Sequence, residues 1–376
     1  MAVSRINEAG LNVNQYGNRN LIINGAMQVA QRVGLESNTR NGYGSVDRWS
    51  VLYTGNDEAP TQEQVDVASG TTPYELGFRK AFKITNGNQT SGAGAGDYIG
   101  IYYYMEGQDI SSSGWKATDP NSKITISYWV KSSVAQTFYA KARAYASSQY
   151  EYTYSIALSA DTWTKVTETM PGNSNFSSLV NTNAAGFNHN VMLFFGTDYT
   201  NNKTLGEWAV KDNANKSPDM TSTWYTTNDA TFEITGVQLE VGDTATDFEH
   251  RTFADDLQKC ERYYQVLLKH GDASDGGNTV LGAAGVMYSS SYLAAPFSFK
   301  TTMRASPTLR SADSTGCFKF YRNGSNDVFD DFSTGTARST YSLELYNNTD
   351  ISGTAGHAGF IYAVNSNATL AVDAEL

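Results

Sequence analysis

Residues 124–131 read Ile-Thr-Ile-Ser-Tyr-Trp-Val-Lys, and this stretch decides the fold class of the chain. Apolar and polar side chains alternate along it. The apolar phase consists of Ile124, Ile126, Tyr128 and Val130. Successive side chains of a β-strand point to opposite faces, so a period of two predicts a strand with one face in a core.

The same pattern recurs on both sides of this segment. Further strands are predicted at residues 21–23, 138–145, 150–158, 163–170, 191–195 and 232–241. Both phases are apolar in 191–195, which predicts a strand buried on both faces. The phase shifts by one residue at Gly236, and a glycine at such a shift indicates a β-bulge. Short strands joined by long loops rich in Gly, Ser, Asn and Thr favour a β-sandwich over an α/β fold.

One helix is predicted to interrupt the β pattern, over residues 251–271. Thr252 can cap it, with Asp255 at the capping-box position, and Gly271 is a natural stop. Its apolar stripe must pack against something, and a domain junction and a neighbouring subunit are both open. The candidate interface residues on this stripe are Phe253, Leu257, Cys260 and Tyr264.

A second β block follows the helix. Its predicted strands are residues 281–292, 297–303, 317–322, 339–346 and 359–364. The sequence therefore predicts an all-β chain: a β-sandwich over 20–250, the connecting α-helix, and a second, smaller β-sandwich-like domain over 272–376. Residues 1–19 form a polar arm with too few apolar side chains for a core of its own.

The composition excludes several classes of protein. A net charge of −11 argues against a nucleic-acid binder, because such proteins rely on clustered Lys and Arg. No apolar run reaches about 18 residues, so no membrane insertion is predicted. The four histidines are widely spaced and no HExxH, CxxC or GxxxxGK[ST] motif occurs, so no metal or cofactor is predicted. Two buried thiols at Cys260 and Cys317 are favoured over a disulfide.

Two sets of segments together resemble one family. The first set is Asn20-Leu-Ile-Ile-Asn-Gly-Ala-Met-Gln28 and Ser45-Val-Asp-Arg-Trp49. The second is Phe232-Glu-Ile-Thr-Gly-Val-Gln-Leu-Glu-Val-Gly242, Phe248-Glu-His-Arg251 and Cys260-Glu-Arg-Tyr-Tyr-Gln265. Across residues 20–310 the chain resembles tail-fibre and related virion-appendage proteins of tailed bacteriophages, of the marine phage type. The resemblance implies a protein of the virion exterior, a homotrimer joined to other virion proteins through its N-terminal arm.

Residues 20–250 also resemble the jelly roll of carbohydrate-binding modules, which implies a jelly-roll β-sandwich and a glycan ligand. Such modules hold a structural Ca²⁺ with carboxylates at places that are here Gln28 and Thr235-Gly236. A hard cation prefers several carboxylate oxygens, so no calcium site is predicted.

Aromatic side chains outside the clean strand phases are the candidate glycan-binding residues. In residues 101–105 one phase should enter the core and leave Tyr102 and Tyr104 facing outward. The remaining candidates are expected in polar loops and are Trp115, Trp208, Trp224 and Tyr225. An exposed ring can stack on the C–H face of a sugar, but these rings can equally pack beneath the loops or between subunits.

Two functions are open at this stage. The first is a virion appendage that binds a glycan on the host surface, with weak single-site affinity multiplied by trimeric presentation. The second is a purely structural decoration or connector protein whose aromatic loops make subunit contacts. Enzymatic depolymerisation is not predicted, because the chain lacks the short repeats of a β-helix tailspike.

Overall fold

The computed structural model describes residues 18–270, 280–311 and 314–376. The chain divides into two compact units, residues 1–256 with Leu376 and residues 257–375, and each is described by itself. The division falls inside the predicted connecting helix. Most of the predicted N-terminal arm, residues 1–17, lies outside the described residues.

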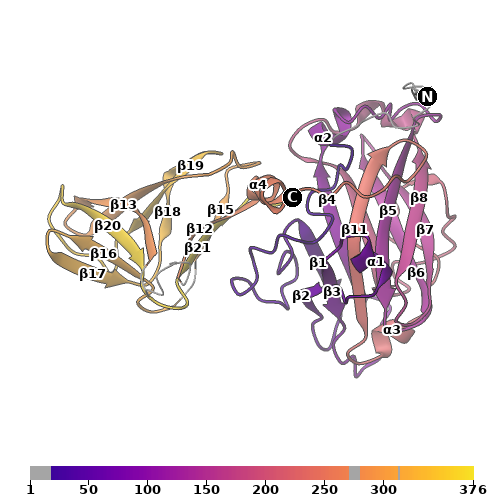
Figure 1. The fold of residues 1–376 in the computed structure, drawn as a ribbon, viewed down its shortest axis with the longest axis horizontal. Coiled ribbons are helices and arrows are strands. Elements are labelled where there is room, and N and C mark those ends of the chain that lie inside the picture. Colours follow the sequence, from indigo (N-terminus) through magenta and orange to yellow (C-terminus); the bar gives the residue numbers. More distant parts are fainter. Residues whose placement is uncertain (1–17, 271–279, 312–313) are drawn as a thin grey trace, which may run out of the picture. The chain divides into compact units, whose positions relative to one another are not determined.

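The first unit is a sandwich of two antiparallel sheets (Figure 1). The six-stranded sheet has the order β1-β4-β9-β6-β7-β10, from β1 (Trp49–Thr54), β4 (Tyr98–Glu106), β9 (Ala185–Phe195), β6 (Gln136–Tyr145), β7 (Gln149–Leu158) and β10 (Trp208–Val210). The five-stranded sheet has the order β2-β3-β11-β5-β8, from β2 (Thr61–Asp66), β3 (Lys80–Thr85), β11 (Thr231–Val241), β5 (Lys123–Ser132) and β8 (Thr164–Pro171). The chain crosses repeatedly between the sheets, as in a jelly roll.

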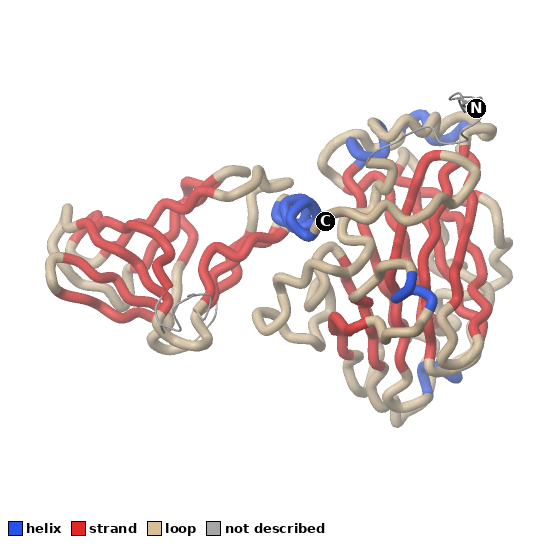
Figure 2. The backbone as a smooth tube through the Cα atoms, in the orientation of Figure 1, coloured by secondary structure: helices blue, strands red, loops and turns tan. Residues whose placement is uncertain are grey.

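Short helical turns join these strands (Figure 2). They are α1 (Thr72–Glu75), α2 (Gly107–Ser111), a 3₁₀ turn at Ser174–Ser178, and α3 (Thr223–Thr226). The core lies between the two sheets, and the apolar phase of β5 is fully buried in it. The expectation of an all-β sandwich is confirmed.

The predicted bulge at Gly236 is confirmed. The pairing of β11 with β5 shifts register between Thr235 and Gln238, and Gly236 has φ of +64°. A Cβ at this position would lie 2.6 Å from Cζ of Phe78. Glycine is therefore required at this position for two reasons: the backbone is left-handed, and the Phe78 ring approaches too closely for a side chain.

Residues 21–23 do not form the predicted strand. The segment runs beside β11, where the Asn20 side chain takes bonds that a strand ladder would use: Nδ2 donates to the Val237 carbonyl, and Oδ1 accepts from the Leu239 amide. The turn predicted at Asn24 is present, with φ of +58°. Two backbone bonds, from the Leu21 amide to the Leu239 carbonyl and from the Val237 amide to the Gly25 carbonyl, complete the contact, so the Asn20 side chain takes the place of part of a strand ladder.

The second unit contains two more antiparallel sheets. The three-stranded sheet has the order β12 (Tyr264–Lys269), β21 (Thr369–Asp373), β15 (Thr308–Ser311). The seven-stranded sheet has the order β17 (Ser325–Phe329), β16 (Phe318–Arg322), β20 (Ala358–Ala363), β13 (Val280–Ser289), β14 (Tyr292–Ser298), β19 (Ser342–Asn347), β18 (Ser333–Arg338). A phenylalanine-rich core of its own includes Phe318, Phe329 and Phe332.

The observed helix is less than half as long as predicted, with 9 residues. Helix α4 covers Phe253–Glu261 and begins as predicted, with the Asp255 amide donating to Oγ1 of Thr252. Residues 264–269 are instead strand β12, paired with β21. Aromatic and branched side chains favour a strand, and the pairing with the distant strand β21 overrides the helical spacing.

This change of structure divides the candidate interface residues. Phe253 is 54% exposed and Leu257 is half-buried, whereas Cys260 and Tyr264 are buried. Cys260 and Tyr264 therefore offer no surface to a neighbouring subunit, and of the two uses expected for the stripe only packing within the chain is open to them. Both cysteines are buried thiols.

Replacement of Gly236 by alanine should destabilise the first unit more than the same change at Gly70. Both residues have positive φ, but nothing lies within 4 Å of a Cβ built on Gly70. Each variant carries the backbone cost, about 1 kcal/mol, and Gly236→Ala adds about 1–3 kcal/mol from overpacking against Phe78. Equilibrium urea unfolding measures both, and equal losses would refute the packing argument.

Candidate functional site on the outer face of the six-stranded sheet

Two of the candidate aromatics lie in the core of the first unit. Trp224 and Tyr225, on α3, are both 0% exposed. The indole N–H of Trp224 donates to the carbonyl of Thr231 (3.0 Å). The ring of Tyr225 stacks on Phe194 at 4.4 Å and its hydroxyl donates to Asp97 (3.0 Å). The expectation of ring faces open to a ligand is therefore not met at these positions.

Trp115 and Trp208 belong to a second cluster of rings. Trp115 is 5% exposed and donates to the Ser122 carbonyl, while Trp208 is half-buried and donates to the Pro171 carbonyl. Both pack edge-on against Phe176, at 6.1 and 4.9 Å. Trp115 lies in a loop, as expected, whereas Trp208 begins strand β10 and not a loop. Packing of both rings against Phe176 buries apolar area that the surrounding Gly, Ser and Asn cannot supply.

Trp115→Ala should therefore act on stability. Removal of a buried tryptophan costs about 3–5 kcal/mol, and the expected result is a large fall in the thermal midpoint of the first unit. Differential scanning calorimetry measures it. A variant with an unchanged midpoint but altered ligand binding would show that the ring is a binding residue and not a core residue.

Tyr102 and Tyr104 do face outward, as predicted. Ile101, Tyr103 and Met105 of β4 are at most 2% exposed within the core, while the two alternate tyrosines are partly exposed. The Tyr102 and Tyr104 rings are stacked, with centroids 6.2 Å apart and an angle of 9° between planes. The alternation of β4 thus places a parallel pair of rings on the outer face of the six-stranded sheet.

Strand pairing brings polar side chains beside these rings. Asn190 and Asn188 of β9 lie opposite Tyr102 and Tyr104, and Arg143 of β6 lies opposite Asn188. We use the name Tyr–Arg face for a set of four accessible side chains on this side of the sheet: Tyr102, Tyr104, Arg143 and Tyr145.

A charged cluster lies within the sheet face beneath them. One oxygen of Glu151, on β7, accepts from Nζ of Lys141 (2.8 Å) and from Nε and Nη2 of Arg143 (2.9 and 2.6 Å). Glu151 and Lys141 are buried. The two cations outweigh burial and hold the pKa of Glu151 below its usual range, while burial lowers the pKa of Lys141. Glu151 therefore remains an anion that fixes the Arg143 guanidinium in place.

The floor of the face holds buried acceptors that lack a partner. Oδ1 of Asn188, Oδ1 of Asn190 and Oε2 of Glu151 make no hydrogen bond. Burial raises the pKa of Tyr104 to about 12, so its phenol stays protonated and can donate or accept. Polar groups buried in this way are costly, and such costs are retained at functional sites.

A further basic side chain, Lys216, lies against aromatic rings from the end of β9 and from the segment that follows it. Nζ of Lys216 lies 4.2 Å from the ring centroid of Tyr199 and 5.3 Å from that of Phe195. The Lys216 carbonyl accepts from the hydroxyl of Thr153 on β7 (3.1 Å), which ties this segment to the sheet. Lys216 interacts electrostatically with Glu151 and Arg143, so it adds a third basic side chain to the surroundings of this carboxylate.

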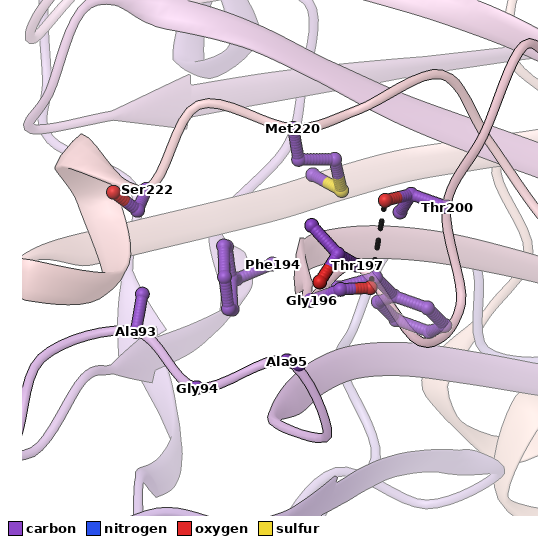
Figure 3. A pocket seen from close by; sticks show the side chains of 10 residues that line it. Ala93, Gly94, Ala95, Phe194, Gly196, Thr197, Thr200, Met220 and Ser222 are labelled. Atoms are coloured by element: carbon purple, nitrogen blue, oxygen red, sulfur yellow. Dashed lines mark hydrogen bonds between the residues drawn. The ribbon is translucent and has the colours of Figure 1, made fainter.

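A hollow at the end of β9 is too small to be the main site. Figure 3 shows its lining, in which the Thr200 hydroxyl bonds to the carbonyl of Gly196. Its volume is about 200 Å³, below the roughly 300–1,000 Å³ typical of ligand pockets. Small residues such as Gly94 and Ala95 line much of it, leaving few polar groups to orient a ligand.

Sequence reasoning found only part of the Tyr–Arg face. The alternation of residues 101–105 predicted that Tyr102 and Tyr104 face outward. It did not identify Arg143, Glu151, Asn188 or Asn190 as parts of the site. Residues 139–145 read Tyr-Ala-Lys-Ala-Arg-Ala-Tyr, and their alternation signals one phase of small residues and one of large polar ones. That signal could have identified Arg143 as outward-facing, but not as a neighbour of the tyrosines.

Within residues 18–270, 280–311 and 314–376, no helix is long and apolar enough to cross a membrane. In the same part of the chain, no group of three or more His, Cys, Asp or Glu side chains is placed to hold a metal ion.

His189 lies under the face, on the core side of β9, and makes stability depend on pH. It is fully buried, its Nε2 bonds to the Tyr154 hydroxyl (2.9 Å), and burial lowers its pKa to about 3. Below its unfolded pKa of about 6.5 the unfolded chain binds a proton that the folded chain does not, so stability falls as pH falls.

Relative to His189→Gln, the wild-type free energy of unfolding should decrease by up to about 1.4 kcal/mol per pH unit between about pH 6 and pH 4. Urea unfolding at several pH values, with the variant as reference, isolates this contribution from the other titrating groups. Parallel profiles for the two proteins would show that His189 is not held neutral.

Comparison with known proteins gives structural likenesses only. No protein-family model matches the sequence, and no curated protein matches it. Similar solved structures include the enzymatically active domain of tailspike protein 4 of bacteriophage CBA120, at 13% identity and a TM-score of 0.31. This likeness covers 59% of our chain and 21% of that chain, so our chain spans only about a fifth of its length.

Carbohydrate-binding modules are also among the similar structures. The family 11 module of a cellulosomal cellulase of Clostridium thermocellum matches at 13% identity and a TM-score of 0.27, covering 56% of our chain and 95% of that chain. TmCBM61, solved with β-1,4-galactotriose, matches at 10% identity and a TM-score of 0.27, covering 59% of our chain and 99% of that one.

Proposed function

We propose that this protein binds a glycan through the Tyr–Arg face. The observation that carries the proposal is the stacked pair of Tyr102 and Tyr104 beside an Arg143 guanidinium that Glu151 holds in place. Parallel rings offer flat apolar surfaces to the C–H faces of sugar rings, and the guanidinium donates hydrogen bonds to their oxygens. Side chains on paired strands are held rigidly, as a binding site requires.

The charges favour a glycan that carries carboxylate or sulfate groups. Lys141 and Arg143 bond to one carboxylate and Lys216 interacts with it electrostatically, in a chain whose net charge is −11. Two of the five N–H donors of Arg143 are used on Glu151, which leaves others for a planar anion. The local excess of positive charge therefore supports an acidic ligand in a protein that elsewhere repels one.

The proposed role is binding without a chemical step. A glycosidase needs a carboxylic acid of raised pKa and a second carboxylate. Glu151 has a lowered pKa and is held by two cations, so it is unsuited to donate a proton. This supports a receptor-binding role over depolymerisation.

The proposal also covers where the protein is located and how it is assembled. The resemblance of residues 20–310 to virion-appendage proteins of tailed bacteriophages supports a place on the virion exterior and binding to host-surface glycans. It also supports a homotrimer attached to other virion proteins through residues 1–19. The alternative, a purely structural decoration or connector protein, loses the support of Trp224, because its own unit buries this ring and no neighbouring virion chain is needed.

Tyr104→Ala and Arg143→Gln should each weaken binding to acidic glycans at least tenfold, which corresponds to about 1.4 kcal/mol. The measurement is an array of acidic polysaccharide fragments, followed by titration calorimetry of the best ligand. Binding should also weaken as salt is raised, because charge contributes to it.

Tyr74 and Arg79 provide a matched control. Arg79 lies 3.9 Å from the Tyr74 ring centroid, so the pair has the same chemistry outside the Tyr–Arg face. Tyr74→Ala and Arg79→Gln should leave binding unchanged. If folded wild-type protein binds no acidic glycan, or if both pairs of variants bind alike, the proposal fails.

A further inference from the structure

A second cluster of tyrosines lies in the other unit, on the seven-stranded sheet. Tyr288, at the end of β13, is 78% exposed. Its ring meets that of Tyr292, on β14, edge to face at 5.8 Å. Tyr292 in turn stacks on Tyr346 of β19, with centroids 5.0 Å apart and planes within 10° of parallel. Three rings from three adjacent strands thus form one continuous aromatic surface.

Strand register explains why these rings meet. Residues 289 and 292 are paired across the turn between β13 and β14, which brings Tyr288 and Tyr292 together. Ala294 pairs with Tyr346, so Tyr292, two residues before Ala294, is the diagonal neighbour of Tyr346 on the same face. The buried phase of the same strands, including Met287, Leu293 and Leu345, packs into the core of the unit. The tyrosines are therefore held outward by the alternation.

A hollow with a polar edge adjoins the rings. It has a volume of about 430 Å³ and is lined by Tyr288, Ser289, Tyr292 and Glu344. This volume lies within the range of about 300–1,000 Å³ typical of small-molecule sites. Oε1 of Glu344 lies 3.4 Å from the Tyr292 hydroxyl, which donates to it. A carboxylate at the edge of an aromatic surface can accept two hydroxyl protons of a sugar at once.

We infer that the cluster of Tyr288, Tyr292, Tyr346 and Glu344 is a second saccharide-binding site, selective for neutral sugars. The rings supply the stacking surface, and Glu344 and Ser289 supply hydrogen bonds. Among the described residues that line the hollow, Glu344 is the only charged one, and it repels a carboxylate or sulfate. The site thus has the opposite charge preference to the Tyr–Arg face and does not depend on it.

A contact between copies of the chain is the competing use of this surface. Exposed apolar side chains continue on the next strands of the same sheet, among them Phe360 on β20 (52% exposed) and Tyr321 on β16. These side chains do not line the hollow. The saccharide is favoured because the hollow combines rings with a carboxylate that would be costly to bury against an apolar partner.

The test uses the full chain carrying Tyr104→Ala and Arg143→Gln together, so that binding at the Tyr–Arg face is weakened. Neutral gluco-, galacto- and manno-oligosaccharides are the probes, followed by saturation-transfer NMR and calorimetry. At least one probe should bind, and Tyr288→Ala and Glu344→Gln should each weaken that binding at least tenfold. Because Tyr288 is largely exposed, its replacement should leave the thermal midpoint unchanged, which separates loss of binding from misfolding.

Phe360→Ala is the matched control, since it removes an exposed ring from the same sheet outside the hollow. It should leave saccharide binding unchanged. The inference is overturned if no probe binds, or if the Tyr288 and Phe360 variants bind alike. It is also overturned if Tyr288→Ala shifts the oligomeric state by sedimentation while saccharide binding stays the same. Failure of the Tyr–Arg face alone would abolish binding of acidic glycans only.

Discussion

Strand β9 is hydrogen-bonded along most of its length to β4 on one side and to β6 on the other, and the Tyr–Arg face depends on this pairing. The register sets Asn188 and Asn190 between the tyrosines of β4 and the basic residues of β6. Nδ2 of Asn190 adds a bond to the Ile101 carbonyl of β4, which locks the two strands further. A shift of one residue in any of these strands would send the polar set into the core, so the register is specified on both sides of the sheet.

The Tyr–Arg face contains buried charges, and hydrogen bonds offset the cost of burying them. Placing Glu151 and Lys141 out of contact with water is expensive, and their mutual attraction offsets this cost only with good hydrogen-bonding geometry. Three bonds to a single oxygen of Glu151 supply that geometry. A buried ion pair is a weak source of stability, so its value here lies in holding Arg143 at a fixed place in the sheet.

The two surfaces use the same structural device with different electrostatics. In each, alternation along antiparallel strands sends one phase into a core and lines up tyrosines on the other side. Basic side chains held on Glu151 lie beside the first pair of rings, whereas a carboxylate borders the second cluster. One chain would then present two saccharide sites of different selectivity, and repeated presentation raises the avidity of weak sites.

The sequence alone determined the features that depend on local pattern. The alternation of residues 124–131, the bulge at Gly236 and the outward phase of Tyr102 and Tyr104 all follow from period and backbone preference. These properties are set by residues close together in the chain, so a reader of the sequence can find them.

The tertiary structure decided what depends on distant partners. It made Tyr264–Lys269 a strand, because this segment pairs with β21, which is distant from it in the sequence. It buried Trp115, Trp224 and Tyr225, because the exposure of a ring in a loop depends on what covers it. It also brought Arg143, Asn188 and Glu151 to the tyrosines, since strand order and register arise from long-range pairing that no local pattern encodes.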